Sequence, residues 1–372
     1  MKIVHIITDL DTGGAEIMLY KLLSSLHDEA LNSIVISLMG RGKITERIEA
    51  LGVKVETLDL GQGERPSWQT IKKLRQVMRA FNPDIVQGWM YHGNIVAAVA
   101  VFLFDPMRRK VKLFWNVRQT LYDINSEKTQ TRWLIMLGRW LSFFPYSIIY
   151  NSNLSAEQHC NVGYSSKKTK IIPNGFDLQK FRPDQNRRQQ LREELRVSES
   201  TILIGHISRL HPMKDHATLL RAINRVIENI FGSGSKQEVL FLLVGHGVTS
   251  ELSSNTAIRF LGERSDIPKI MSALDIVVSS SAWGEGFPNV IGEAMASKVP
   301  CVVTDVGDSA YIVGKYGRVC PVGDDQCIAS SLLQLIENTQ ERKTAGKQAR
   351  KRIKENYSMD KIKKEYLKEW GF

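Results

Sequence analysis

Short apolar runs alternate with longer stretches of helical periodicity along most of the chain. The runs are rich in Val, Ile and Leu, which is typical of strands buried on both faces of a parallel sheet. They occupy residues 2–8, 33–38, 53–58, 83–87, 111–117, 201–207, 238–244, 258–261, 274–278 and 300–304. Apolar residues three or four positions apart recur in most of the segments between them. The pattern predicts an α/β protein with parallel sheets.

The alternation is interrupted between residues 171 and 183. There the sequence Pro173-Asn174-Gly175 favours a fixed turn, and Phe181-Arg182-Pro183 follows. A chain of 372 residues is long for one domain and natural for two. We therefore expect a linker here, with one α/β domain before it and another after it.

An apolar run of eighteen residues, Trp133–Tyr150, approaches the length of a membrane span. Arg139 and Pro145 interrupt the run, and its last four residues are typical of a strand. These features favour a core helix followed by a strand. In a second interpretation, a partly exposed face from Trp133 to Phe144 contacts a bilayer surface.

The most informative segment runs from Leu274 to Thr304 and reads as strand, polar loop, helix and strand. In open parallel sheets, ligands bind where a strand's carboxyl end leads into a helix. Glu285 and Glu293 stand eight positions apart, so on one helix their carboxylates would lie on roughly the same side. Pro288 suits a first helical turn, which puts Glu285 just before the helix and Glu293 inside it. Taken alone, the two acids could equally stabilise the helix dipole and face solvent.

A second loop of this kind follows the strand at residues 201–207. Arg209 and Lys214 lie in it five positions apart, and two cations at such a turn can clamp a diphosphate. A surface loop with two basic residues is also common, so the spacing alone leaves both interpretations open. His206, His211 and His216 recur every five residues, a spacing that does not place them on one helix face. We therefore expect no metal site among them.

Three loops of the N-terminal half carry further candidates. Gly13 and Gly14 stand at a strand-to-helix turn, where they let backbone N–H groups approach a phosphate or sugar, although tight turns need glycine anyway. The full G-x-G-x-x-G spacing is missing, so no nicotinamide cofactor is indicated. His92 follows a strand and precedes a helix; a lone histidine is more often structural. Arg118 follows the strand at 111–117 and could bind a ligand or be an ordinary surface charge.

Glu285-Gly286-Phe287-Pro288 with Glu293 resembles the E-x7-E signature of retaining glycosyltransferases of the GT-B type, family 4. The Arg209/Lys214 pair and the linker turn resemble family motifs in the same order and spacing. The resemblance covers nearly the whole chain. It implies two Rossmann-like domains with parallel sheets that face an interdomain cleft. The implied division is an N-terminal domain of residues 1–172 plus 357–372, a linker of residues 173–183 and a C-terminal domain of residues 184–356.

The resemblance also implies a role for each candidate residue. The roles are catalysis for Glu285 and His92; donor-sugar binding for Glu285, Gly286, Phe287, Pro288 and Asn289; ribose binding for Glu293; diphosphate binding for Arg209, Lys214 and Gly14; base binding for Arg264 and Ile267; and acceptor binding for Gly13 and Arg118.

The implied reaction moves a sugar from a UDP- or GDP-sugar to an acceptor hydroxyl with retained anomeric configuration. The resemblance implies no metal and no other cofactor, because cationic side chains can replace an ion's charge. It is nearest to members that build bacterial surface polysaccharides such as O-antigen, capsule or lipopolysaccharide. The expected acceptor is therefore a glycan or a polyprenyl-diphosphate-linked glycan. A nucleotide-sugar epimerase or a phosphorylase of the same fold are rival interpretations.

The net charge of +11 is concentrated in two stretches. Residues 341–370 carry eleven Lys or Arg against five Asp or Glu, and residues 105–118 carry five against one. These stretches are either solvated helix faces or attract an anionic surface, such as membrane lipid or a diphosphate-bearing acceptor. A non-catalytic nucleic-acid-binding protein is disfavoured, because the basic residues lie without interleaved aromatics or a known module.

The four cysteines, Cys160, Cys301, Cys320 and Cys327, form no C-x-x-C pair, so we expect neither a zinc site nor a disulfide framework. A reducing cytosol fits this composition. Residues 1–7 read as a short strand followed by an acidic loop rather than as a secretory signal. We expect a cytoplasmic protein, with the inner face of the cytoplasmic membrane as a place where it could bind peripherally.

Overall fold

The computed structural model describes residues 1–11, 13–26, 32–61, 63–64, 66–107, 110–121, 124, 128–232, 234–235 and 237–372. The chain divides into two compact units. Unit 1 consists of Met1–Gly175 and Met359–Phe372, and unit 2 of Phe176–Ser358. The first boundary falls within the segment expected as a linker, and the C-terminal segment returns to unit 1 at Met359 rather than at Tyr357.

Unit 1 is built on a parallel sheet that, within the described residues, has seven strands in the order β3-β2-β1-β4-β5-β6-β7. The strands are β1 (Lys2–Ile7), β2 (Asn32–Ser37), β3 (Lys54–Thr57), β4 (Ile85–Trp89), β5 (Lys112–Val117), β6 (Ser147–Tyr150) and β7 (Thr169–Ile171). Helices cover both faces, which is why the central strands are apolar on both sides rather than alternating.

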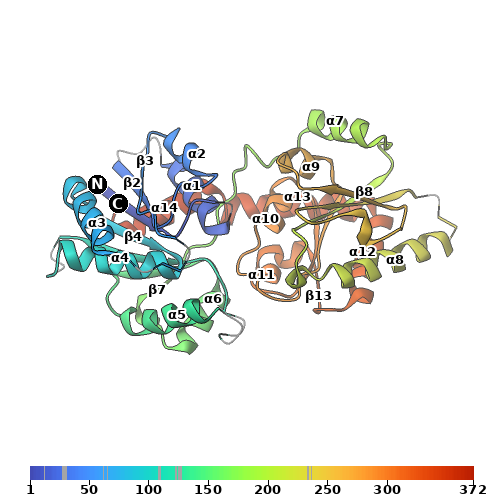
Figure 1. Ribbon diagram of the computed structural model, residues 1–372. Coiled ribbons are helices and arrows are strands. Elements are labelled where there is room, and N and C mark those ends of the chain that lie inside the picture. Colours follow the sequence, from blue (N-terminus) through green and yellow to red (C-terminus); the bar gives the residue numbers. More distant parts are fainter. Residues whose placement is uncertain are drawn as a thin grey trace. The chain divides into compact units, whose positions relative to one another are not determined.

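The two faces of this sheet carry different sets of helices (Figure 1). One face is covered by α1 (Gly14–Ser25), α2 (Thr45–Glu49) and α14 (Met359–Trp370). The other is covered by α3 (Trp68–Phe81), α4 (Met90–Phe104), α5 (Thr129–Leu141) and α6 (Asn153–Val162). The apolar run at 133–150 is therefore a helix followed by β6, as its interruptions indicate. Within the described part of the chain, no helix is long and apolar enough to cross a membrane.

Polar contacts hold the C-terminal helix α14 to the unit 1 sheet. The Trp370 indole Nε1 donates to Gln87 Oε1 at 2.9 Å, and the Asn116 amide donates to the Tyr366 hydroxyl at 2.8 Å. All four side chains are buried. A buried polar group is costly unless it is paired, so these bonds favour one position of α14 over others on the same apolar face.

Unit 2 contains, within its described residues, a parallel sheet of six strands in the order β10-β9-β8-β11-β12-β13. The strands are β8 (Ile202–Ile207), β9 (Val239–Val244), β10 (Ile258–Gly262), β11 (Ile276–Ser279), β12 (Cys301–Thr304) and β13 (Arg318–Cys320). One face carries α7 (Gln185–Leu195), α9 (Ile267–Ala273), α10 (Asn289–Ala296), α11 (Ser309–Val313) and α13 (Thr339–Asn356). The other carries α8 (His216–Gly232) and α12 (Asp325–Glu337) (Figure 1).

Cys320 and Cys327 form a disulfide, with 5.7 Å between their Cα atoms. The sequence did not indicate a disulfide framework, and this single pair is a departure from that expectation. Cys320 ends β13, and Cys327 lies in the first turn of α12, so the short turn between the two elements brings the side chains together. The two cysteines are seven positions apart in the sequence, and this spacing alone does not predict the turn that brings them together.

In each sheet the strand order reverses beside the unit's first strand. β1 lies between β2 and β4, and β8 lies between β9 and β11. In doubly wound sheets, the loops that leave the carboxyl ends of the two strands at such a reversal diverge, and ligands bind there. In unit 1 these are the loops after β1 and β4, and in unit 2 the loops after β8 and β11.

Candidate functional site

The loops at the reversal point of unit 2 bring two candidate residues into contact. The Lys214 ammonium forms an ion pair and hydrogen bond with Glu285 Oε1. The Ser281 hydroxyl donates to the same carboxylate oxygen at 2.8 Å. The exposed fractions of the Lys214 and Glu285 side chains are 18% and 11%, so water reaches both. Because both groups are partly open to solvent, the Lys214 ammonium can bind an anionic group of a ligand, and the Glu285 carboxylate can bind a hydrogen-bond donor.

Lys214 ends η3, the single 3₁₀ turn Pro212–Lys214, and this turn is bonded to the loop after β11. The Ser280 hydroxyl donates to the Lys214 carbonyl at 2.8 Å, and the Ala282 amide donates to the Met213 carbonyl at 2.8 Å. The two loops therefore form one bonded surface, although about seventy positions separate them along the chain. This surface fixes the backbones on which Lys214 and Glu285 stand.

A close backbone approach supports Glu285 from the other side. Gly307 has a φ of +61°, and a Cβ atom built on it would lie 2.2 Å from the Glu285 carbonyl oxygen. The next residue, Asp308, donates its amide to the Gly286 carbonyl at 2.9 Å. Only glycine fits position 307 without moving Glu285, since a side chain there would both clash and strain the backbone.

Phe287 anchors the loop in the core of unit 2. Its ring is buried, lies 6.1 Å from the ring of Phe176 in a stacked arrangement, and lies 5.4 Å from the ring of Tyr357. Pro288 then stands at the N-cap of α10, one position earlier than a first-turn proline. Asn289 begins the helix. Glu293 lies half-buried inside α10, in keeping with its expected place on the helix.

Arg209, the second expected cation, lies exposed in the loop after β8. Across the residues that the structure describes, its guanidinium forms no ion pair, whereas Lys214 is paired with Glu285. The loop is held against the one after β9: the Leu210 amide donates to the His246 carbonyl at 2.8 Å. A Cβ on Gly245 would lie 1.9 Å from the Ser208 carbonyl oxygen, so this approach also requires glycine. Arg209 thus has the freedom to bind an anionic ligand.

A buried histidine joins the two strands that carry the site. His206 Nδ1 lies 3.0 Å from the Val278 carbonyl, and the Ser208 hydroxyl lies 2.8 Å from its Nε2. Burial lowers the pKa of His206 to about 3, so the ring is neutral at pH 7. With Nδ1 protonated, the ring donates to Val278 on β11 and accepts from Ser208. Sequence reasoning excluded a metal role for His206 but did not find this link between β8 and β11.

The two residues expected to bind the base occupy different settings. The Arg264 guanidinium bonds both carboxylate oxygens of Asp266, at 2.8 and 2.7 Å, and Glu194 at 2.8 Å. These bonds raise the pKa of Arg264 and occupy its side chain. Ile267 begins α9 and packs, half-buried, against the unit 2 core. The base-binding roles stay predictions, and for Arg264 a contact through the backbone fits these bonds better than one through the guanidinium.

In unit 1, the glycine pair lies at the start of α1. Gly13 is the N-cap and Gly14 the first helical residue. A Cβ on Gly13 would lie 2.1 Å from Glu16 Oε2, so the Glu16 carboxylate already fills the space beside it. Burial, and then the nearby charges of Asp9 and Asp11, raise the pKa of Glu16. Gly14 is exposed and has open space around it, so a ligand can reach the amino end of α1.

His92 lies in the first turn of α4, after the carboxyl end of β4. Met90, two positions earlier, has a φ of +62°, an uncommon conformation for a residue with a side chain. A Cβ on Gly93 would lie 2.4 Å from the Ile6 carbonyl, so α4 begins in close contact with β1. Backbone strain of this kind gathers at functional sites. His92 is half-buried, and burial lowers its pKa.

Arg118 is not the surface charge that one interpretation expected. Its guanidinium donates to the Ile172 carbonyl and to Asn174 Oδ1, both at 3.0 Å, and to the Tyr366 hydroxyl. Burial lowers its pKa, and the Tyr366 oxygen partly offsets this shift. Arg118 therefore ties β5 to the end of the N-terminal segment and to α14. The acceptor-binding role stays a prediction, and these bonds give the side chain a structural role independent of it.

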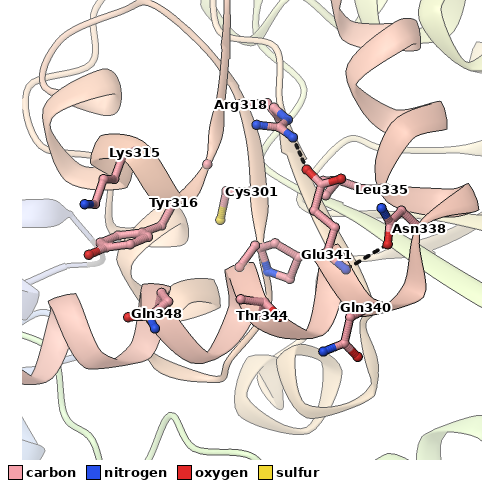
Figure 2. A pocket seen from close by; sticks show the side chains of 13 residues that line it. Cys301, Lys315, Tyr316, Arg318, Leu335, Asn338, Gln340, Glu341, Thr344 and Gln348 are labelled. Carbon is pink, nitrogen blue, oxygen red and sulfur yellow. Dashed lines mark hydrogen bonds and ion pairs between the residues drawn. The ribbon is translucent and has the colours of Figure 1, made fainter.

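A cavity of 590 Å³ lies elsewhere in unit 2, between α13 and the amino ends of β12 and β13 (Figure 2). Its wall includes Cys301, Tyr316 and the Arg318–Glu341 ion pair. The amino ends of parallel strands lie at the sheet edge opposite their carboxyl ends. This cavity is therefore separate from the Lys214–Glu285 contact.

The chain matches two protein-family models. Residues 12–180 match the model described as Glycosyltransferase Family 4, and residues 201–338 match the model described as Glycosyl transferases group 1. The matches cover most of unit 1 and the loops of unit 2 that hold Arg209, Lys214 and Glu285. With its two parallel-sheet α/β units, the chain has the GT-B architecture. The chain is therefore a glycosyltransferase, with a family 4 domain in its N-terminal half and a group 1 domain in its C-terminal half.

Two relatives of known name illustrate the family's range. The chain is 26% identical over 238 residues to UDP-Gal:alpha-D-GlcNAc-diphosphoundecaprenol alpha-1,3-galactosyltransferase of Escherichia coli, an alignment that spans 60% of each protein. It is 27% identical over 306 residues to N-acetyl-alpha-D-glucosaminyl L-malate synthase of Bacillus anthracis, covering 79% of this chain and 76% of that one. The chain thus matches less than two thirds of the first relative's length.

Among solved structures, the Anabaena protein HepE in complex with UDP-glucose is similar over almost the whole chain. The TM-score is 0.79 and the identity 25%, with 99% of this chain and 98% of that one covered. The shared architecture confirms the fold expected from the alternation of strands and helices.

Proposed function

We propose that this glycosyltransferase moves a sugar from a nucleotide-sugar donor to an acceptor hydroxyl with retained anomeric configuration, without a metal ion or other cofactor. The observation that carries the proposal is the contact of Lys214 and Glu285 at the reversal point of the unit 2 sheet. UDP-sugars are the favoured donors over GDP-sugars. The UDP-glucose complex of HepE and the UDP-Gal donor in the name of the E. coli relative support this preference.

The chemistry of the reaction explains why a cation and an acid are needed together. The leaving group is a nucleoside diphosphate, and its growing negative charge is what the transition state must stabilise. Lys214 and Arg209 supply positive charge for it. Glu285 accepts hydrogen bonds from the donor sugar's hydroxyls, aided by the backbone of residues 286–289, and Glu293 accepts them from the ribose. Ser281 positions the Glu285 carboxylate.

Retention requires that the acceptor oxygen bond to the anomeric carbon on the face from which the diphosphate departs. In this proposal, a phosphate oxygen of the departing diphosphate takes the acceptor's proton, so no carboxylate of the protein has to act as base. His92 contacts the donor sugar at the reacting centre, and burial lowers its pKa, which favours the neutral ring. Gly14 contributes to diphosphate binding, and Gly13 contributes to acceptor binding.

The proposed acceptor is a glycan on a polyprenyl diphosphate, used in the synthesis of a bacterial surface polysaccharide such as O-antigen, capsule or lipopolysaccharide. The name of the E. coli relative, which specifies a diphosphoundecaprenol acceptor, supports this choice. Such an acceptor would place the enzyme at the cytoplasmic face of the membrane. The B. anthracis relative is named for a small hydroxy acid, L-malate, and this acceptor class is the main alternative.

The test is a thermal-shift panel of UDP- and GDP-sugars, followed by transfer assays with the best donor. Mass spectrometry of a polyprenyl-diphosphate glycan acceptor should show the mass of one added sugar, and NMR of the product should show the donor's anomeric configuration. The rate should be unchanged by EDTA. Transfer only to malate would reject the lipid acceptor, an inverted product would reject retention, and epimerisation of the donor without acceptor would reject transfer.

A further inference from the structure

Helix α5 presents a stripe of large apolar side chains to solvent. Trp133, Leu137, Trp140 and Phe144 follow one another at spacings of four, three and four, which places them on one side of the helix and its C-terminal turn. The two tryptophans are 73% and 69% exposed. Phe143 and Tyr146 extend the exposed apolar surface beyond the helix end. We call these six residues the α5 stripe.

The opposite side of α5 packs against the rest of unit 1. Ile135 and Gly138 are buried, and a Cβ on Gly138 would lie 2.2 Å from the Tyr164 hydroxyl. That hydroxyl donates to the Ile135 carbonyl at 3.1 Å. The core therefore needs only the inner side of α5. The α5 stripe lies on the outer side, and of its six residues Tyr146 also contacts the core, with its ring 5.5 Å from that of the buried Phe114.

Cations surround the α5 stripe. From Lys128 to Ala156 the chain carries three cations and no Asp or Glu. The Arg139 guanidinium lies 5.5 Å from the Trp140 ring, and the Lys112 ammonium lies 5.4 Å from the Tyr146 ring. Long basic side chains next to aromatic rings are typical of helices that lie in the interface of a bilayer.

Two further lysines lie beside the C-terminal end of α5. Lys167 and Lys168 belong to the short 3₁₀ helix η2 (Ser166–Lys168). The chain just before η2 contacts α5 directly, because the Ser165 amide donates to the Ser142 hydroxyl at 3.0 Å. Lys167 is exposed and Lys168 is half-buried. Arg108 and Arg109, which belong to the basic stretch noted in the sequence, lie outside the described residues.

We infer that the α5 stripe is a docking surface for an anionic lipid bilayer. Trp and Phe would enter the boundary between headgroups and acyl chains, and the surrounding cations would meet the headgroup charges. The inference rests on the proposed function only in that a lipid-linked acceptor brings the enzyme to a membrane. α5 has 13 residues and is too short to cross a bilayer, so the binding is peripheral.

The charges around the α5 stripe favour a bilayer over a second copy of the chain. A two-fold dimer through this surface would bring the same patch of each copy together, and with it the same cations. Like charges across an interface oppose association. An anionic membrane instead provides both an apolar interior for the aromatic rings and a partner for every cation.

The test uses the full-length protein and vesicle flotation at about 0.15 M salt. Vesicles of phosphatidylglycerol and phosphatidylethanolamine should carry the protein, and vesicles of phosphatidylcholine alone should not. Replacing both tryptophans, Trp133→Ser with Trp140→Ser, should weaken binding to the anionic vesicles about a hundredfold, about tenfold per ring. Lys167→Gln with Lys168→Gln should weaken it about fivefold per charge.

The matched control is Trp68→Ser with Phe231→Ser, which removes two aromatic side chains that are 78% and 80% exposed and lie outside the α5 stripe. It should bind vesicles like the wild type. The Trp133/Trp140 variant should also keep the wild-type melting temperature and its rate with a water-soluble acceptor, because its side chains face solvent. Flotation needs no donor sugar, so this test and the test of transfer can fail independently.

Three outcomes would overturn the inference. The wild type could fail to float with anionic vesicles, it could bind neutral and anionic vesicles equally, or the Trp133/Trp140 variant could float like the wild type. Sedimentation that showed a wild-type dimer, dissociated by the two tryptophan substitutions, would assign the α5 stripe to a second copy instead.

Discussion

Replacing Glu285 by glutamine should separate nucleotide binding from sugar transfer. In the free protein the Lys214 ammonium is paired with the Glu285 carboxylate, the group that also repels an incoming diphosphate. Glutamine keeps the shape of the side chain and can still accept the Ser281 hydroxyl. The negative charge is lost. Glu285→Gln should therefore bind UDP more tightly than the wild type and yet transfer sugar poorly.

The expected size of each effect follows from the charges involved. Two unit charges about 6 Å apart at an effective dielectric constant of about 20 repel by about 2.8 kcal/mol. Because the Lys214 and Glu285 side chains are 18% and 11% exposed, solvent screens this to about 1 kcal/mol, or about fivefold in UDP affinity. Loss of two charge-assisted bonds to sugar hydroxyls, at about 1.5 kcal/mol or more each, should slow transfer at least a hundredfold, that is by ~3 kcal/mol.

Calorimetry with UDP measures the first effect, and kcat/KM for the donor in a transfer assay measures the second. Glu341→Gln is the matched control: it also removes one acid from an ion pair, with Arg318, but at the amino edge of the sheet (Figure 2). It should change neither quantity. Weaker UDP binding by Glu285→Gln, or a transfer rate within a few-fold of the wild type, would refute the assignment of Glu285 as the acid that shares Lys214 with the diphosphate.

Four other substitutions test separate parts of the site and fold. Lys214→Ala and Arg209→Ala should each weaken UDP binding about tenfold or more by calorimetry, and unchanged affinity in both would remove the proposed clamp. Gly307→Ala should slow transfer because its Cβ would lie 2.2 Å from the Glu285 carbonyl, whereas Gly323→Ala, also at positive φ but in open space, should not. Burial lowers the pKa of His159 to about 4, so stability should fall as pH drops from about 6.5 towards 4, where only the unfolded chain takes up the proton. His159→Gln should lower that slope by up to about 1.4 kcal/mol per pH unit in denaturant titrations, and an unchanged slope would contradict the burial argument.

The strands could be predicted because a short run of Val, Ile and Leu indicates a buried strand without information from distant parts of the chain. The run at 274–278 became β11 (Ile276–Ser279), and the run at 133–150 resolved into α5 and β6 on either side of Pro145. Ser152, just after β6, caps α6 through a 3.0 Å bond from the Ser155 amide. These features depend on neighbours within a few residues.

The partners of individual side chains could not be predicted in the same way. Arg118 meets Tyr366 across 248 positions of sequence, and Arg264 meets Glu194 across 70. No periodicity connects such residues, so the sequence does not predict the bonds of Arg118 to Ile172, Asn174 and Tyr366, and its acceptor-binding role stays a prediction. Lys214 and Glu285 are as far apart, but both follow strands that are neighbours in the sheet, and that placement together with the family resemblance pointed to the same site.

The contribution of Ser281 and of the His206–Ser208 pair was also missed. A signal was present for Ser281, since Ser280 and Ser281 follow β11 where a ligand-binding loop was expected. For His206 the sequence offered no useful signal, because its regular spacing from His211 and His216 bears only on a possible metal site and not on a bond between strands. Its burial between β8 and β11 is a property of the assembled sheet.

A crystal structure of the protein with UDP tests the central claim most directly. The account predicts that the diphosphate lies at the carboxyl ends of β8 and β11, with phosphate oxygens about 2.7–2.9 Å from Lys214 Nζ and from the Arg209 guanidinium. UDP bound elsewhere, or at this place with both cations turned away from its phosphates, would contradict it.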